Sequence, residues 1–266
     1  MVEAEAGATP RRATRARHDA LVALVRGGVD SVATLAERVG VSASTVRRDL
    51  TILQREGRIA RTYGGAMVRE SFQERSFNES SLIGRRAKAA IAAAAADLVP
   101  AGGSVFVDAG TTCLALARIL AERAPLRVAT RGLEAALLLT RVPDIDVVLV
   151  GGHVQPLSHG VVGPLASMVL DRLAFDVAFL GADAVDPDRG LGEPTVEETD
   201  VKERAAGSAT EVVLLADASK IGPAKVGAWI PLDPAWTLVT DAAAGDEAVS
   251  AFERRGLRVL VTGAAD

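Results

Sequence analysis

Three stretches near the start of the chain repeat apolar residues at helical spacing. They predict helices over residues 18–25 and 32–39 and a third helix that begins after Ser42. Glycines at 27–28 and at Gly40 end the first two helices, so a tight turn joins the second helix to the third. A helix, a tight turn and a second helix together make a helix-turn-helix unit.

The third predicted helix has one apolar stripe and one polar face. Val46, Leu50 and Leu53 follow the spacing i, i+4, i+7 and predict the buried stripe. The opposite face combines short hydroxyl side chains with arginines, which are the residue types that contact bases and phosphates in the major groove. We expect DNA contacts from Ser42, Ser44, Thr45, Arg47, Arg48 and Thr51.

A short β-hairpin is predicted after this helix. Residues 58–63 have strand character, the glycines at 64–65 supply a turn, and residues 66–68 return. This hairpin would form a wing, from which Arg61 and Tyr63 are expected to reach phosphate or the minor groove. An exposed arginine near a turn is also commonly just a solvated residue, so both interpretations stay open.

From residue 103 onward, short apolar runs alternate with helical patterns. This alternation predicts an α/β domain with a mostly parallel sheet, in which ligands bind beyond the carboxyl ends of the strands. The predicted strands cover residues 104–107, 127–129, 147–150, 177–180, 212–216, 238–240 and 259–261.

Small, polar or charged residues follow these strands. The first strand leads through Asp108 to Gly110, Thr111 and Thr112, which precede a helix over residues 113–120. A helix N-terminus offers unpaired N–H groups and the positive end of a dipole, so a phosphate is expected there, although threonine is also an ordinary N-cap. Other strand ends carry comparable residues, namely Thr130, Arg131, Gly151, Gly152, Asp183 and Lys220.

Charge is distributed unevenly along the 266 residues. The chain has a formal net charge of −4, yet residues 11–69 hold twelve arginines and five acidic residues, a balance of +7. The remainder holds 18 basic and 29 acidic residues, a balance of −11. The basic part is expected to meet a polyanion, although a solvated charged face would have the same composition.

Composition also limits the other possible functions. The longest apolar run, residues 89–96, is much shorter than the roughly 20 residues of a membrane span, and no secretory signal is evident. We therefore expect a cytoplasmic protein without membrane contact. The single cysteine, Cys113, and three scattered histidines indicate neither a disulfide nor a metal site, and no cofactor is expected.

The run VSASTVRRDL at residues 41–50, followed by GGA at 64–66, resembles the DNA-binding domain of the DeoR family of sugar-metabolism regulators. Residues from about 75 to 241 resemble the family's sensor domain, whose fold is akin to the ribose-5-phosphate isomerase and CoA-transferase group. The resemblance implies that a phosphorylated effector is surrounded by Asp108, Gly110, Thr111, Thr112, Thr130, Gly151, Gly152, Lys202 and Lys220.

Two positions depart from the family pattern. Ala109 stands where relatives usually carry serine, and Arg131 stands where they usually carry asparagine. Arg131 would either bind a phosphate or carboxylate or pair with an acidic neighbour. Lys202 likewise has two interpretations, an effector contact or a surface ion pair with glutamates on its own helix, and Lys220 is the favoured phosphate ligand.

These observations predict two domains and a regulatory function. We expect a DNA-binding regulator, most often a repressor in this family, that acts on a carbohydrate operon and binds double-stranded operator DNA as a homodimer or larger even oligomer. A phosphorylated sugar or related metabolite would control it. The expected divisions are a disordered tail over residues 1–16, a winged helix-turn-helix domain over 17–69, a linker over 70–81 and a sensor domain over 82–266.

The alternative is a sugar-phosphate isomerase-like enzyme attached to a DNA-binding domain. Asp183 and Asp186 resemble the acidic motif of ribose-phosphate isomerases, whose carboxylates transfer protons. Residues 190–202 lack the glycine-rich loop of those enzymes. The sequence therefore favours a protein that is not an enzyme.

Overall fold

The computed structural model describes residues 10–26, 29, 31–55, 60–62, 65–67 and 74–263. The chain divides into two compact units, Met1–Gln73 and Glu74–Asp266, and each is described by itself. Within the described ranges, no helix is both long and apolar enough to pass through a lipid bilayer.

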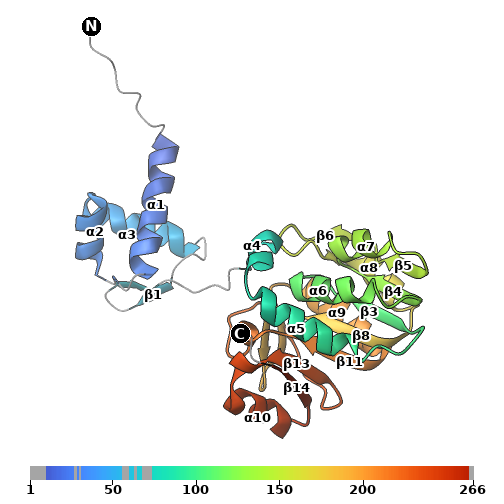
Figure 1. The fold of residues 1–266 in the computed structure, drawn as a ribbon. Helices are drawn as coiled ribbons and strands as arrows, with labels where there is room; N and C mark the ends of the chain where they lie inside the picture. The colour runs from blue at the N-terminus through green and yellow to red at the C-terminus, as the bar shows by residue number, and fades with distance from the viewer. Residues whose placement is uncertain are drawn as a thin grey trace. The chain divides into compact units, whose positions relative to one another are not determined.

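The first unit is a three-helix domain with a β-hairpin. Leu21, Leu35, Val46, Leu50 and Leu53 form its core and are at most 1% exposed, which confirms the apolar stripes predicted from the sequence. Burying each leucine stabilises the unit by about 1.5–3 kcal/mol. In chain order the elements are α1 (Pro10–Arg26), α2 (Val32–Val39), α3 (Ala43–Arg55) and the antiparallel strands β1 (Ala60–Thr62) and β2 (Gly65–Met67) (Figure 1).

One buried carboxylate joins α1 to α3. Asp49 accepts a hydrogen bond from Nε of Arg17 at 2.7 Å and lies 3.2 Å from Nε2 of His18. Burial by itself raises the pKa of Asp49, but Arg17 and His18 outweigh that effect and lower it. The pattern of apolar residues did not predict these contacts. Asp49 and its two partners are polar, and each partner lies more than thirty residues from Asp49 in the sequence.

Helix α1 begins earlier than the sequence predicted. Of the expected tail over residues 1–16, residues 10–16 are helical, and residues 1–9 lie outside the described residues. The segment from Pro10 to Arg17 has no apolar stripe, but its alanines and arginines are strong helix formers and proline is favoured in a first helical turn.

The second unit is built on a seven-stranded sheet in which every neighbouring pair is parallel. Each of the seven strands predicted from the sequence is present, within three residues at either end. In spatial order the strands are β14 (Arg258–Thr262), β13 (Thr237–Asp241), β11 (Ala209–Leu215), β8 (Phe175–Gly181), β3 (Ser104–Val107), β4 (Leu126–Thr130) and β5 (Ile145–Leu149).

Smaller β-elements stand beside this sheet. Their two to four residues are too few to show an alternating pattern, so the sequence did not predict them. They are the hairpin β6 (His153–Val154) and β7 (Val161–Val162), and an antiparallel sheet of β12 (Ala228–Ile230), β10 (Gly190–Glu193) and β9 (Ala184–Asp186).

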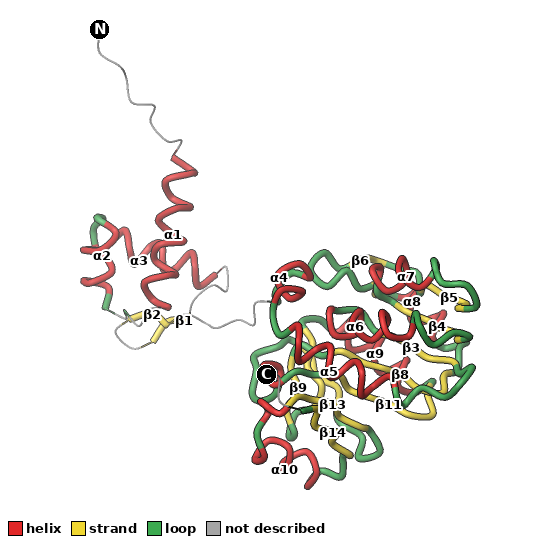
Figure 2. The backbone as a smooth tube through the Cα atoms, viewed as in Figure 1, coloured by secondary structure: helices red, strands yellow, loops and turns green. Residues whose placement is uncertain are grey.

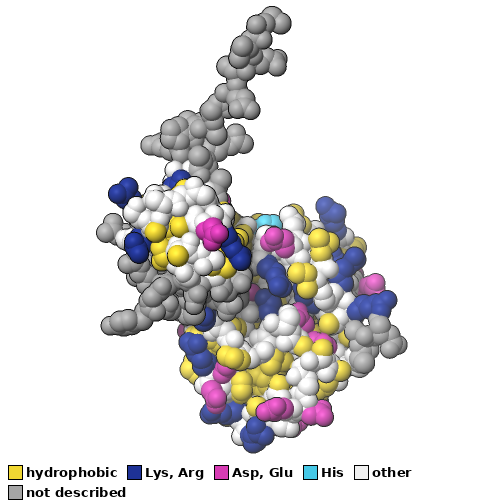
Figure 3. Space-filling view, turned by 90° about the vertical axis from the view of Figure 1, so that its left-hand side faces the viewer, with side chains coloured by type: hydrophobic (Ala, Val, Ile, Leu, Met, Phe, Trp, Pro, Cys, Tyr) yellow, Lys and Arg dark blue, Asp and Glu magenta, His cyan; other side chains and the backbone are white. Residues whose placement is uncertain are grey.

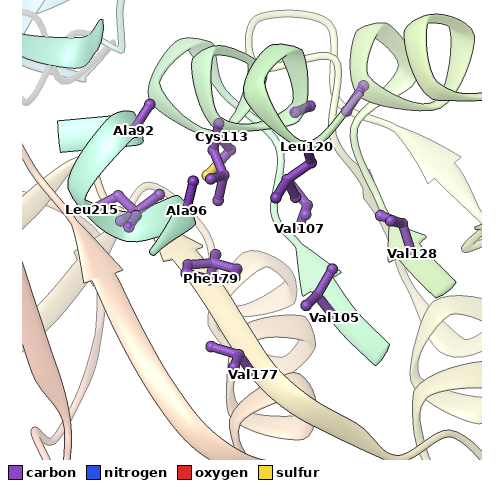
Figure 4. Close-up of a cluster of buried hydrophobic side chains, with 14 of the residues drawn as sticks. Ala92, Ala96, Val105, Val107, Cys113, Leu120, Val128, Val177, Phe179 and Leu215 are labelled. Carbon is purple, nitrogen blue, oxygen red and sulfur yellow. The ribbon is translucent and has the colours of Figure 1, made fainter. Parts of the chain in front are cut away.

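Helices cover both faces of the main sheet (Figure 2). Val105 and Val107 of β3 face one helical layer, and Phe106 between them faces the other, as strand geometry requires. Cys113 of α6 is fully buried in the same core cluster as Val107 and Phe179 (Figure 4). One layer contains α5 (Arg85–Ala96), α6 (Thr111–Leu120) and α7 (Leu133–Leu139), and the other contains α8 (Pro164–Leu170), α9 (Val196–Gly207) and α10 (Asp246–Arg254).

The predicted linker over residues 70–81 contains a helix. Residues 70–73 lie outside the described residues, but α4 (Phe77–Leu82) begins at a capping box in which Ser76 and Glu79 bond each other's backbone N–H. Ser-x-x-Glu is a known start signal for helices, so the sequence did contain the evidence. The N–H of Phe77 donates to the carbonyl oxygen of Leu157 at 2.7 Å, which places α4 beside the loop between β6 and β7 (Figure 1).

Candidate functional site

A pocket opens where β3, β8 and β11 end, at the edge of the sheet where parallel topology places ligands. The start of α6, one face of α9 and the segment from residue 74 to 83 form its walls. Its lining combines hydroxyl groups with side chains of both charges. The charged and hydroxyl-bearing residues are Glu74, Arg75, Ser80, Lys88, Thr111, Thr112, Arg131, Ser158, Asp183, Glu193, Glu198, Lys202, Asp217, Ser219 and Lys220.

The N-terminus of α6 faces this pocket. Gly110 is its N-cap residue with φ of 103°, and no side chain of the described residues caps the helix. A side chain at that φ would be strained, although nothing lies within 4 Å of where its Cβ would stand. The N–H groups of the first turn therefore keep the capacity to bind an anion.

Four buried charged side chains meet at the pocket: Arg131, Glu193 and Lys202 line it, and Asp108 lies beneath them. Asp108, at the end of β3, contacts Nε of Arg131 and lies 2.9 Å from Nζ of Lys202. Lys202 also lies 2.6 Å from Oε1 of Glu193 and donates to the carbonyl oxygen of Gly181 at 2.7 Å. Each of the four side chains is at most 4% exposed. We call Asp108, Arg131, Glu193 and Lys202 the buried ion cluster.

The cluster members set one another's ionisation. Burial by itself raises the pKa of Asp108, but the positive charges of Arg131 and Lys202 outweigh it and hold that pKa below its ordinary value. Burial raises the pKa of Glu193 to about 7, and Lys202 only partly opposes the rise. Burial lowers the pKa of Lys202, but Asp108 and Glu193 outweigh that effect and raise it. Near neutral pH, Glu193 is therefore the one member that titrates.

Of the two interpretations of Arg131, the structure shows the pairing with an acidic neighbour. Its Nε pairs with Asp108, whereas its buried Nη1 has no hydrogen-bond partner among the described residues. A Cβ on Gly160 would lie 2.4 Å from that Nη1, so only glycine leaves room for the guanidinium. Arg131 lines the pocket and retains a donor that a ligand would satisfy.

The two lysines of the predicted site differ in environment. The surface ion pair considered for Lys202 is wrong, because the residue is 2% exposed and contacts Asp108 and Glu193. Lys220 lies in the short 3₁₀ helix Ala218–Lys220, lines the pocket and donates to Oδ1 of Asp183 at 2.7 Å.

Three residues that were predicted for the effector site do not line the pocket. Thr130 is fully buried, and its hydroxyl accepts the N–H of Gly132 at 3.0 Å. Gly151 is exposed, and Gly152 packs against the backbone of Val162. These residues shape the turn after β4 and the start of the β6–β7 hairpin. The other predicted residues, Gly110, Thr111, Thr112, Arg131, Asp183, Lys202 and Lys220, line the pocket, and Asp108 lies beneath them.

Sequence reasoning missed several pocket residues. Glu74, Arg75 and Lys88 come from the linker and the following helix, which were not considered as part of a binding site. Glu193 and Glu198 were not predicted as pocket residues, and Glu198 was considered only as an ion-pair partner of Lys202. The single signal for Lys88 was rarity, since the chain has only four lysines.

The two carboxylates of the isomerase-like motif do not converge. Asp183 lines the pocket and pairs with Lys220. Asp186 is buried, does not line the pocket, and accepts the N–H groups of Asp188 and Arg189 within a turn.

In the first unit, the predicted DNA-contacting face lies on α3. Ser44, Arg47 and Arg48 are exposed, whereas the hydroxyl of Ser42 caps the helix by accepting the N–H of Thr45 at 3.2 Å. Thr51 donates its hydroxyl hydrogen to the carbonyl oxygen of Arg47 at 2.8 Å. The predicted hairpin is present, but Tyr63 and the side chain of Arg61 lie outside what the structure describes.

Surface charge differs in kind between the units. Basic and acidic side chains are interspersed on the face of the second unit shown in Figure 3. The first unit contains the whole basic segment, whose balance over residues 11–69 is +7. A duplex would be attracted to a surface of net positive charge.

Models of one protein family match both units of the chain. A family model described as "DeoR-like helix-turn-helix domain" matches residues 17–72, and one described as "DeoR C terminal sensor domain" matches residues 84–242. The HTH-type transcriptional regulator GlpR of Haloferax volcanii is 32% identical over 86% of this chain and 90% of its own. The glycerol-3-phosphate regulon repressor of Escherichia coli K12 is 30% identical over 77% of this chain and 82% of its own.

Two further comparisons are more distant. The putative aga operon transcriptional repressor of Escherichia coli O157:H7 is 27% identical over 93% of both chains. A solved ribose 5-phosphate isomerase from Methanocaldococcus jannaschii is 24% identical over 51% of this chain and 53% of its own, with a TM-score of 0.38.

Removing the central carboxylate should destabilise the second unit strongly. Asp108→Asn leaves Arg131 and Lys202 with Glu193 as their shared acidic partner, so we expect a loss of about 3–5 kcal/mol of unfolding free energy. Denaturant titration of the full chain measures it. Asp97→Asn is the matched control, because that carboxylate is mostly exposed in its pair with Arg123 and should contribute about 1 kcal/mol or less. Equal losses in both variants would contradict the cluster's structural role.

Stability should also depend on pH through Glu193. Its folded pKa of about 7 lies above the ordinary 4.5, so the folded state holds this proton more tightly than the unfolded chain. The contribution is full below pH 4.5 and is lost as pH rises to 7, by on the order of 1–3 kcal/mol.

Glu193→Gln should therefore reduce the fall in stability across this window, measured by urea unfolding at several pH values. Glu211→Gln, at an exposed position of β11, should leave the fall unchanged. A Glu193→Gln profile parallel to that of the unaltered protein would show that this carboxyl ionises normally in the folded chain.

Proposed function

The chain belongs to the DeoR family of transcriptional regulators, and on that premise we propose that it is a cytoplasmic DNA-binding repressor of a carbohydrate operon, controlled by a phosphorylated sugar-like effector. The pocket in the second unit is the effector site, and α3 of the first unit reads the operator. The observation that carries the proposal is the uncapped N-terminus of α6, which faces a pocket whose mixed lining includes Arg131 and Lys220.

The phosphate would bind at the start of α6. Backbone N–H groups of Thr111 and Thr112 and the helix dipole favour an anion there. The unpartnered Nη1 of Arg131 supports the same assignment, because a buried donor without a partner is costly unless a ligand satisfies it. Lys220 also lines the pocket and supplies a partly exposed cation.

The remaining lining suits the hydroxyl groups of a sugar. Glu198 accepts a hydrogen bond from Ser158 at 3.3 Å, and Asp183 and Ser219 also line the pocket. Carboxylates accept and serine hydroxyls donate or accept, so the pocket offers partners to several ligand hydroxyls at once. A bare inorganic anion would leave these groups unused and would bind more weakly than a phosphorylated polyol.

The names of relatives support the proposed kind of target. Their names include repressors of an aga operon and of a glycerol-3-phosphate regulon. We propose that this chain acts likewise, and that it binds its operator as a homodimer or larger even oligomer, since helix-turn-helix proteins commonly match two symmetric half-sites. Enzyme activity is not proposed, because Asp186 closes a turn away from the pocket instead of facing Asp183.

Operator recognition is tested on α3. Arg47→Ala and Arg48→Ala remove side chains from the exposed face near the helix start, and each should cost about 1–3 kcal/mol of operator affinity if it contacts a base. Fluorescence anisotropy at fixed salt measures the change on the operator located by footprinting. Arg38→Ala, at the end of α2, is the control and should cost less. Unchanged affinity in both α3 variants would defeat the assignment of the recognition helix.

Effector recognition is tested at Lys220. Lys220→Ala removes a charge-assisted contact and should weaken effector binding about tenfold to a hundredfold, while operator affinity without effector stays the same. Lys225→Ala, which does not line the pocket, should bind the effector normally. The measurement is calorimetric titration with the phosphorylated sugars that raise the melting temperature. A Lys220→Ala variant that binds and responds at unaltered effector concentrations would refute the site.

A further inference from the structure

The segment that directly follows the first unit forms one wall of the pocket. The second unit begins at Glu74, and the pocket is lined by Glu74, Arg75, Phe77, Ser80 and Ile83. We call residues 74–83 the connector. A ligand in the pocket therefore meets the very residues by which the sensor is joined to the DNA-binding unit.

A few specific contacts hold the connector in place. The ring of Phe77 stacks on His159 with centroids 5.3 Å apart, and His159 in turn contacts Glu134 at 2.5 Å. Nζ of Lys88 donates to the carbonyl oxygen of Ser80 at 2.7 Å.

Burial adds little to these contacts. None of the residues of α4 is buried, and Leu82 is 75% exposed. A segment held by few contacts and little buried area separates from a folded core more readily than the core itself unfolds. A ligand that contacts the connector can therefore change how often the connector is docked on the sensor domain.

The connector adds charge to the pocket. Arg75 joins Lys88 and Lys220 along the same lining, so three cations face one space. Burial lowers the pKa of Lys88, and the charges of Lys220 and Arg75 lower it further, although Asp217 opposes them. The mutual repulsion of these three cations decreases when an anion binds in the pocket.

Glu74 is the acidic residue of the connector that lines the pocket. Burial raises the pKa of its carboxyl to about 7, and the charges of Glu198 and Asp183 add to the rise. Protonation of Glu74 would remove a negative charge from the pocket. Arg75, Lys88 and Lys220 would then interact with the ligand without that competing carboxylate.

We propose that the connector is a ligand-binding element of the sensor, in which Arg75 joins Lys88 and Lys220 around the phosphate of the effector. This inference rests on the proposed function. Because the ligand then binds the docked connector more tightly than the undocked one, occupancy holds residues 74–83 against the sensor. If operator binding needs a different connector position, the ligand weakens operator binding. The factor equals the one by which operator binding weakens ligand binding, since coupling between two sites is reciprocal.

Hydrogen exchange of the full chain tests the proposal. Inorganic phosphate and glycerol 3-phosphate are added separately, and amide exchange is followed by mass spectrometry. We expect slower exchange both at the start of α6 and across residues 74–83, with glycerol 3-phosphate effective at the lower concentration. Arg75→Gln should raise the ligand concentration needed for half-maximal protection of α6 about tenfold.

Arg86→Gln is the matched control, because Arg86 is exposed on α5 and does not line the pocket. Protection of α6 without protection of residues 74–83, or equal ligand requirements in the two variants, would overturn the connector's role and leave the effector site standing. Absence of protection at α6 with every ligand of a wider sugar-phosphate panel would overturn the proposed function and this inference together.

Discussion

Asp108, Arg131, Glu193 and Lys202 are drawn from β3, the turn after β4, β10 and α9, and they meet where water is excluded. Burying one charge without a partner costs several kcal/mol, so these elements must all end at the same place for any of the four to be tolerated. The main chain also contributes contacts and space to the cluster. Gly181 gives its N–H to Asp108 and its carbonyl oxygen to Lys202, and Gly160 leaves the space that the guanidinium of Arg131 fills.

The ion cluster also contributes to the charge of the pocket, because Arg131, Glu193 and Lys202 line it. Near neutral pH its two cations are only partly balanced, because burial keeps the Glu193 carboxyl partly protonated. Arg131 and Lys202 line the same pocket as the uncapped start of α6, and a cation and a helix N-terminus each favour a bound anion. Arg131 and Ala109, the two positions at which the sequence resemblance was incomplete, both line this pocket.

Prediction from the sequence succeeded where local chemistry determines structure. The parallel strands, α2 and α3 follow from apolar runs and helical spacing, and the start of α6 at the pocket follows from a strand that leads into Gly110, Thr111 and Thr112. It failed where distant polar residues meet. Lys202 resembles a surface lysine among glutamates, and only the fold shows that Asp108 and Glu193 are its partners. Thr130 and Gly152 stand at promising positions, yet their polar groups and backbone are used in local turns.

The account depends on a phosphate at the start of α6, so a crystal structure of the full chain with its bound sugar phosphate tests it most directly. The account predicts phosphate oxygens within about 3 Å of the N–H groups of Thr111 and Thr112 and of Nζ of Lys220. A ligand bound elsewhere, with its phosphate distant from α6, would contradict it.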